Sequence, residues 1–130
     1  MILLDTHIWV WWVDANRQLS SSQRKHLEDH ASAGLGVSVI SCWEVAKLAE
    51  VKRLELRLPV ADWIRQALAY PGIRFLYLTP RIVIESTQLP GSFHRDPADQ
   101  LIVATARIRG CSLLTADARI LGYPHVRTLT

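Results

Sequence analysis

Four acidic side chains stand far apart in the chain, close to the ends of short apolar segments or at the start of a helical one. They are Asp5, Glu44, Asp99 and Asp117. If the apolar segments form one parallel sheet, these carboxylates meet at its carboxyl edge, where open α/β sheets bind ligands. Crowded carboxylates repel one another, and a hard divalent cation relieves the repulsion; all-oxygen ligands select Mg²⁺ or Mn²⁺ over zinc. The pattern therefore predicts a cation site that activates water and offsets charge on a phosphoryl group.

Each acid also has a purely structural interpretation. Asp5 is able to end a strand or cap a helix that starts near Thr6. Glu44 lies three residues after Ser41, so "SCWE" fits a capping box. Asp117 suits a helix N-cap or a turn. Capping and cation binding are compatible, and both remain open for these acids; the coincidence of four acids at one sheet edge favours the cation site.

The stretch "DPADQLIVATARIRG" separates two neighbouring aspartates by geometry. Asp96 precedes Pro97 and is expected to be the N-cap of a helix that ends at Gly110. Asp99 lies on the helical face that should pack on the sheet, so its carboxylate points toward the end of the sheet. We therefore predict that Asp99 is a ligand of the cation and that Asp96 is the N-cap of the helix that carries it. The remaining members of that face are Ile102, Val103 and Ala106.

Apolar segments without polar alternation alternate with helical patterns along the chain. The strand candidates are residues 2–4, 36–40, 73–78, 112–115 and 126–129. Strands of this kind are covered on both faces. Between them, residues 60–68 carry an amphipathic stripe, and Ser20 with Gln23 forms a capping box. This alternation predicts an α/β fold, a three-layer α/β/α sandwich with a mostly parallel central sheet.

The bulk composition indicates an ordinary globular protein. A chain of 130 residues suits one domain, and its net charge of +3 is compatible with a polyanionic partner. Two unpaired cysteines, Cys42 and Cys111, argue against a zinc cage and indicate a reducing compartment. The start of the chain lacks a basic leader, and its apolar run is too short to span a bilayer. We therefore expect a cytoplasmic protein with no membrane partner.

Four stretches surround the acids in a fixed order: "LLDTHIWVWW" (3–12), "VSVISCWEVAKL" (37–48), "HRDPADQLIVATA" (94–106) and "LLTADARIL" (113–121). Together they resemble the PIN-domain family, and specifically the VapC-like toxins of bacterial toxin–antitoxin pairs. The resemblance implies one PIN-like domain over residues 1–130 and Mg²⁺- or Mn²⁺-dependent endoribonuclease activity. It also implies an RNA substrate, a cognate antitoxin and a homodimer.

The resemblance carries the acidic quartet of the family onto four residues of this chain. We expect Asp5, Asp99 and Asp117 to hold the cation, and Glu44 to bind it or to orient the attacking water. Residues that support the quartet are expected to be Thr6, Thr115, Asp96 and Ser41.

Other polar and aromatic residues near the predicted site have weaker interpretations. Arg95 and Arg119 flank the acids and are candidates for contacts with substrate phosphates, although solvated arginines are the simpler reading. His7, His94 and His125 are assigned no catalytic role. The run "IWVWW" should be partly core, with a protein partner or base stacking as alternatives for its exposed part.

Two other classes of protein compete with the nuclease. A non-catalytic RNA-binding or scaffold module would not need four mutually repelling acids. A phosphoaspartate protein of the receiver or dehalogenase type also gathers aspartates at strand ends. However, His7 stands where a dehalogenase needs its second aspartate, and the end "PHVRTLT" lacks the lysine of a receiver.

Overall fold

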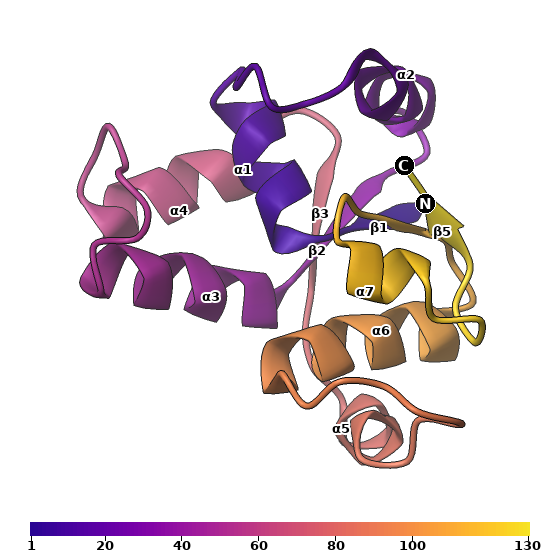
Figure 1. Cartoon of the computed structure of the whole chain (residues 1–130). Coiled ribbons are helices and arrows are strands. Elements are labelled where there is room, and N and C mark those ends of the chain that lie inside the picture. The colour runs from indigo at the N-terminus through magenta and orange to yellow at the C-terminus, as the bar shows by residue number, and fades with distance from the viewer.

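A five-stranded parallel sheet forms the centre of the fold in the computed structural model, which describes residues 1–130 (Figure 1). The strand order is β3-β2-β1-β4-β5, and every neighbouring pair is parallel. The three-layer α/β/α prediction is confirmed, with a sheet that is entirely rather than mostly parallel. The strands are β1 (Ile2–Leu4), β2 (Leu35–Ser38), β3 (Ile73–Leu76), β4 (Leu113–Leu114) and β5 (Thr128–Leu129).

Helices cover both faces of this sheet. One apolar core lies between the sheet and α1, α2, α3 and α4, and the other lies between the sheet and α6 and α7, with α5 packed against α6 (Figure 1). Strand β1 serves both cores, because Ile2 and Leu4 face the first and Leu3 faces the second. The helices are α1 (Thr6–Val13), α2 (Ser21–His30), α3 (Val39–Glu50), α4 (Val60–Leu68), α5 (Pro80–Ser86), α6 (Pro97–Arg109) and α7 (Ala118–Leu121).

Local capping rules explain where several helices begin and end. Ser20 and Gln23 form the predicted capping box of α2. Asp96 caps α6, Pro97 is its first residue, and Gly110 ends it at a φ of 65°, in the left-handed region that favours glycine. These predictions are confirmed.

The start of α3 corrects two predictions. The expected strand at residues 36–40 ends at Ser38, and α3 begins at Val39. The Ser38 hydroxyl accepts a hydrogen bond from the Ile40 amide (3.2 Å) and is the true N-cap. The capping box proposed for Ser41 and Glu44 is therefore wrong, since both lie inside the helix. The β-branched Val39 and Ile40 imitate a strand, but the cap chemistry of Ser38 determines the boundary.

Other strand ends are shorter than expected. The predicted strand at residues 73–78 ends at Leu76, because Thr79 caps α5 with Pro80 in its first turn. The predicted strands at residues 112–115 and 126–129 shorten to two residues each. None of the helices combines the length and apolar character needed to cross a membrane.

The tryptophan-rich helix α1 is split between the core and the surface. Ile8 and Trp9 are fully buried, and Trp9 packs edge-on against Trp63 of α4 with ring centroids 5.1 Å apart. The Trp9 indole N–H also donates to the Ala67 carbonyl (3.2 Å). The amphipathic stripe predicted for residues 60–68 thus meets α1. Trp11 remains partly exposed, so only part of the run is core.

Candidate metal centre

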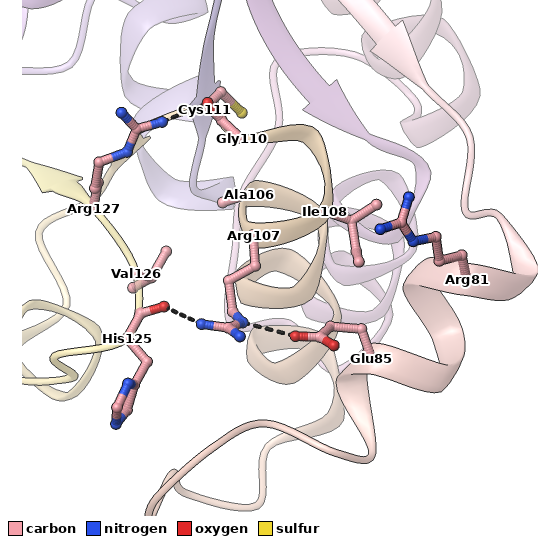
Figure 2. Close-up of a pocket in the computed structure, with 10 residues that line it drawn as sticks. All are labelled: Arg81, Glu85, Ala106, Arg107, Ile108, Gly110, Cys111, His125, Val126 and Arg127. Atoms are coloured by element: carbon pink, nitrogen blue, oxygen red, sulfur yellow. Dashed lines mark hydrogen bonds and ion pairs between the residues drawn. The ribbon is translucent and has the colours of Figure 1, made fainter.

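Clusters of opposite charge lie at the two ends of α6. At its C-terminal end, three arginines are among the ten residues that line a hollow of about 430 Å³: Arg81, Arg107 and Arg127 (Figure 2). Two of them contact other parts of the chain: Arg107 pairs with Glu85 (2.7 Å) and donates to the His125 carbonyl, while Arg127 donates to the Gly110 carbonyl. His125 therefore belongs to this basic hollow and not to the acidic site.

Three of the four predicted acids meet at the N-terminal end of α6, beside the carboxyl edge of the sheet. Asp5 follows β1, Glu44 lies in the second turn of α3, and Asp99 lies in the first turn of α6. Each offers a carboxylate oxygen, and these oxygens all lie within 4.8 Å of one another. Residues 94 positions apart in the chain thus form one anionic cluster.

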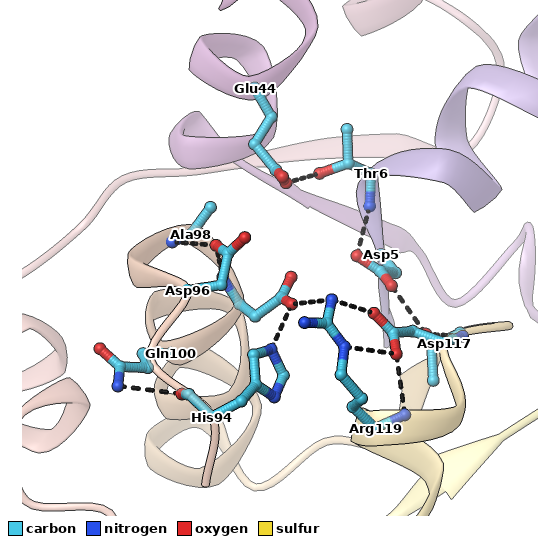
Figure 3. A network of polar contacts seen from close by, with 11 residues as sticks. Asp5, Thr6, Glu44, His94, Asp96, Ala98, Gln100, Asp117 and Arg119 are labelled. Atoms are coloured by element: carbon cyan, nitrogen blue, oxygen red, sulfur yellow. Dashed lines mark hydrogen bonds and ion pairs between the residues drawn. The ribbon is translucent and has the colours of Figure 1, made fainter. Parts of the chain in front are cut away.

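Asp5 is oriented through both of its carboxylate oxygens (Figure 3). Oδ1 accepts from the Thr6 amide (2.8 Å), so Asp5 also caps α1, and Oδ2 accepts from the Thr115 hydroxyl (2.7 Å). The Thr115 oxygen in turn accepts from the Asp117 amide (3.0 Å). Both structural and ligand interpretations of Asp5 are compatible with this geometry, because each oxygen keeps a lone pair.

A chain of hydroxyls orients Glu44. The Thr6 hydroxyl donates to Glu44 Oε1, and Thr6 Oγ1 lies 2.8 Å from Ser41 Oγ (Figure 3 shows the first contact). Since a hydroxyl has one proton, Ser41 donates to Thr6 when Thr6 donates to an ionised Glu44. The fully buried Ser41 therefore supports Glu44 through Thr6, a role that differs from the predicted cap.

The two aspartates of α6 take the positions that helical periodicity predicted: Asp96 caps the helix and Asp99 lies on its buried face. Asp96 Oδ1 accepts from the amides of Ala98 (2.9 Å) and Asp99 (3.2 Å). The Asp99 side chain is buried together with the apolar face of α6, and its Oδ2 lies 2.6 Å from His94 Nε2. Gln100 Nε2 donates to the His94 carbonyl (3.1 Å) and steadies the loop. Sequence reasoning assigned His94 no role, so this contact was missed.

Asp117, the fourth acid, lies at the rim and not in the close cluster. Its Oδ1 accepts from the Arg119 amide (2.8 Å), which makes it the N-cap of α7. The Arg119 guanidinium pairs with Asp117 Oδ2 at 3.2 Å and reaches Asp99 Oδ2 at 3.5 Å (Figure 3). Burial acts to raise the pKa of Asp117, but the hydrogen bonds and charge of Arg119 hold it below its usual range. Arg119 thus already compensates this carboxylate.

The clustered acids carry an electrostatic strain that Asp117 does not. Burial raises the pKa of Asp5 and of Asp99 above their usual range. Burial also raises the pKa of Glu44 to about 7; the charges of Asp5, Asp99 and Asp96 add to this, and the hydrogen bond from Thr6 opposes it. The protein therefore holds three carboxyls whose ionised forms are disfavoured until a positive charge arrives.

The hollow around these acids, about 340 Å³, contains residues that sequence reasoning missed and lacks one that it proposed. Arg53 lines it, although no motif pointed to that residue, and so do His7 and Arg119. Arg95 instead lines a separate polar hollow with Ser86 and neighbouring loop residues. No local sequence signal marks Arg53, because the turn after α3 determines its position.

The donor set suits a hard divalent cation. Asp5, Glu44 and Asp99 offer only oxygen, their ligand atoms are close enough to share one ion, and burial makes their charges costly without one. Neither cysteine lies in this hollow, which argues against a soft metal.

Known proteins are similar to this chain in sequence and in fold. A profile of the PIN domain family matches residues 2–125. The ribonuclease VapC22 of Mycobacterium tuberculosis (strain ATCC 25618 / H37Rv) is 39% identical over 129 residues, covering 99% of this chain and 96% of that protein.

Solved structures of low sequence identity show the same fold. A DNA-bound VapBC from Salmonella typhimurium matches with a TM-score of 0.71 at 18% identity, covering 98% of this chain and 97% of that one. FitAcB from Neisseria gonorrhoeae matches with a TM-score of 0.70 at 21% identity, covering 100% and 97%.

Proposed function

The chain belongs to the PIN domain family, and from this premise we propose that it is a metal-dependent endoribonuclease acting as the toxin of a toxin–antitoxin pair. The proposal is supported by a relative named as a ribonuclease that is 39% identical along nearly the whole of both chains. We further propose that residues 1–130 form one domain and that the substrate is RNA.

The observation that carries the proposal is the close triad of Asp5, Glu44 and Asp99. Three carboxylate oxygens within 4.8 Å are a destabilising arrangement unless a cation binds them. Threonine hydroxyls hold two of the three carboxylates in place, as a preorganised ligand set requires. A scaffold module would gain nothing from this arrangement. The phosphoaspartate alternative loses support because no lysine lines the hollow.

In the proposed mechanism, Asp5, Glu44 and Asp99 would hold Mg²⁺ or Mn²⁺, and Asp117 would contribute from the rim. A bound cation would activate the attacking water and offset charge at phosphorus. Thr6 and Thr115 keep Glu44 and Asp5 in ligand geometry. Asp96 keeps the first turn of α6, and so Asp99, in position by capping it.

Around that centre, the remaining polar residues handle protons and charge. Glu44, which the Thr6 hydroxyl holds in place, would bind the cation directly or orient the attacking water. Its carboxyl has a pKa of about 7 in the free protein, where no cation balances its charge. Arg119 pairs with Asp117 and Asp99 in the free protein and is placed to contact the substrate phosphate when the acids are otherwise neutralised.

The same proposal includes protein partners in the cytoplasm: a cognate antitoxin and a second copy of the chain. Large apolar side chains on the surface support a protein partner, since Trp43, Tyr77 and Ile84 are 56%, 73% and 56% exposed. A solved structure of similar fold is a toxin–antitoxin complex from Klebsiella pneumoniae.

The test is cleavage of single-stranded RNA in Mg²⁺ or Mn²⁺ by the wild type and by Asp5→Asn. We expect the variant to lose at least a hundredfold in rate, with no activity of either protein in a chelator. Asp29→Asn is the matched control, because Asp29 is an exposed aspartate of α2 that pairs only with Lys25. Equal rates for the wild type and Asp5→Asn would remove the acidic cluster from the mechanism.

A further inference from the structure

A second hollow, of about 370 Å³, opens beside the acidic one between α1 and the segment after α3. The two hollows share the side chains of His7, Leu48 and Arg53 as common walls. The two hollows therefore adjoin one another along these three side chains. The residues that line both hollows determine what chemistry they can accept.

Arg53 provides a free positive charge at the junction of the two hollows. Its guanidinium lies on the surface and makes no hydrogen bond or ion pair with protein, in contrast to Arg119. A guanidinium that lines a carboxylate-rich hollow without pairing keeps all its donors for a ligand. A phosphate oxygen is the ligand that its planar fork suits best.

The backbone at Arg53 is fixed by the way α3 ends. The Lys52 amide donates to the Ala49 carbonyl (3.1 Å), and the Arg53 amide donates to the Leu48 carbonyl (2.9 Å). Lys52 adopts a φ of 59°, the left-handed conformation that glycine usually supplies after a helix. These two hydrogen bonds and the left-handed Lys52 set the direction of the chain after α3, so that Arg53 lies at the junction of the two hollows.

Two aromatic rings, one helical turn apart on α1, line the second hollow together with Arg53. The rings of His7 and Trp11 have centroids 5.9 Å apart, and both side chains line the second hollow. Trp11 also lines a smaller hollow with Asp5 and Asp117, so its indole lies beside the acids. Unlike the core residue Trp9, Trp11 is partly exposed and has no indole hydrogen bond to protein.

We propose that Arg53, His7 and Trp11 form a subsite for one nucleotide of single-stranded RNA next to the cleaved bond. The Arg53 guanidinium binds the phosphate of this nucleotide, and the Trp11 indole, flanked by His7, stacks on its base. The inference rests on the proposed ribonuclease function and names how that site holds its substrate. Stacking and phosphate contact tolerate any base, so the subsite favours unpaired RNA over a particular sequence.

Binding of a fluorescein-labelled single-stranded RNA decamer tests the subsite without cleavage, in the Asp5→Asn background with Mg²⁺. Arg53→Ala is expected to weaken binding about tenfold, the worth of one charged hydrogen-bonded contact. It should also reduce the slope of log affinity against log salt by about 0.7, one phosphate contact to a single strand. Arg53→Lys keeps the slope, and Arg65→Ala, at an exposed arginine of α4 that pairs with Asp62, is the control that changes neither quantity.

Trp11 is tested in the same assay by its effect on affinity alone. Trp11→Leu should weaken binding about tenfold at an unchanged salt slope, and Trp11→Phe, which keeps an aromatic face, should retain most of the affinity. A thermal midpoint within a few degrees of the parent shows that each variant is folded. Loss of affinity in Trp11→Leu that Trp11→Phe fails to restore would remove the stacking role.

The failure of this subsite is distinguishable from the failure of the proposed function. In the cleavage-competent protein, Arg53→Ala should raise KM about tenfold with kcat little changed. If the wild type cleaves RNA and Arg53→Ala matches its KM, affinity and salt slope, the subsite is wrong and the nuclease stands. The hollow would then be left to a peptide of the antitoxin.

Discussion

Replacing Glu44 by glutamine separates the electrostatic strain of the acidic cluster from its hydrogen bonding. Burial raises the pKa of this carboxyl to about 7, and the charges of Asp5 and Asp99 add to the effect. Glutamine has the same length and keeps an Oε1 that accepts from the Thr6 hydroxyl, but it carries no charge. Any difference that depends on pH between the two proteins therefore reports the ionisation of Glu44.

The expected size of that difference follows from the shifted pKa. In the unfolded chain Glu44 titrates near 4.5, and in the folded protein near 7. Between these values the unfolded state binds fewer protons, so the free energy of unfolding falls as pH rises, and the full loss is present above pH 7. Taken whole, the shift corresponds to about 3 kcal/mol. Solvent screening of this partly exposed carboxyl reduces it to about 1–2 kcal/mol.

The assay is urea unfolding in a chelator at pH 4.5 and at pH 8. Glu44→Gln should match the wild type at the lower pH and exceed it by about 1–2 kcal/mol at the higher one. With saturating Mn²⁺ at pH 8 the wild type should become more stable than Glu44→Gln, because only the wild type keeps all three carboxylate ligands. Glu50→Gln, an exposed site on the same helix paired with Lys47, is the control. If the difference in free energy of unfolding between wild type and Glu44→Gln is the same at both pH values, the ionisation of Glu44 does not strain the cluster.

Three further substitutions test the supporting contacts. Thr115→Val keeps the shape of a buried side chain but removes the donor to Asp5, and should lower the free energy of unfolding by about 1–3 kcal/mol in urea titrations and slow RNA cleavage. Ser38→Ala removes the N-cap of α3 and should lower the free energy of unfolding by about 1 kcal/mol in the same titrations. An unchanged free energy of unfolding would show that the Ser38 hydroxyl does not stabilise the start of α3. Arg119→Gln removes the guanidinium group that competes with a metal ion for Asp99, so the affinity for Mn²⁺ measured by calorimetry should rise. A lower affinity for Mn²⁺ would mean that Arg119 helps to form the site.

The sequence predicted best the features that depend on neighbours in the chain. Asp96 caps α6 and Asp99 joins its buried face because both follow from helical periodicity and from Pro97. The meeting of Asp5, Glu44 and Asp99 was also predictable, since parallel strands bring their carboxyl ends to one edge. These inferences needed only secondary structure and one topological rule.

Other features depend on details that sequence patterns do not contain. The β-branched Val39 and Ile40 matched a strand as well as a helix, and Ser38 decided between them. Arg53 reaches the acidic hollow because Lys52 adopts a left-handed backbone conformation. Glycine is the usual residue in that conformation, so a lysine gives no sequence signal for the turn.

The loop before α6 is a second case of this kind. His94 contacts Asp99, whereas its neighbour Arg95 lines a different hollow. Adjacent residues of an irregular loop point in different directions, and only the fold determines which of them faces the acids.

Mn²⁺ binding, measured by electron paramagnetic resonance at pH 8 on the wild type and on Asp99→Asn, shows whether Asp5, Glu44 and Asp99 form a cation site. Asp99 is a ligand candidate whose carboxylate no main-chain amide needs as a cap, unlike Asp5. We predict that the wild type binds Mn²⁺ and that Asp99→Asn, which lacks one ligand oxygen charge, loses about tenfold or more in affinity. Asp29→Asn should bind as the wild type does. Equal affinity of Asp99→Asn and the wild type would contradict a cation site at this cluster.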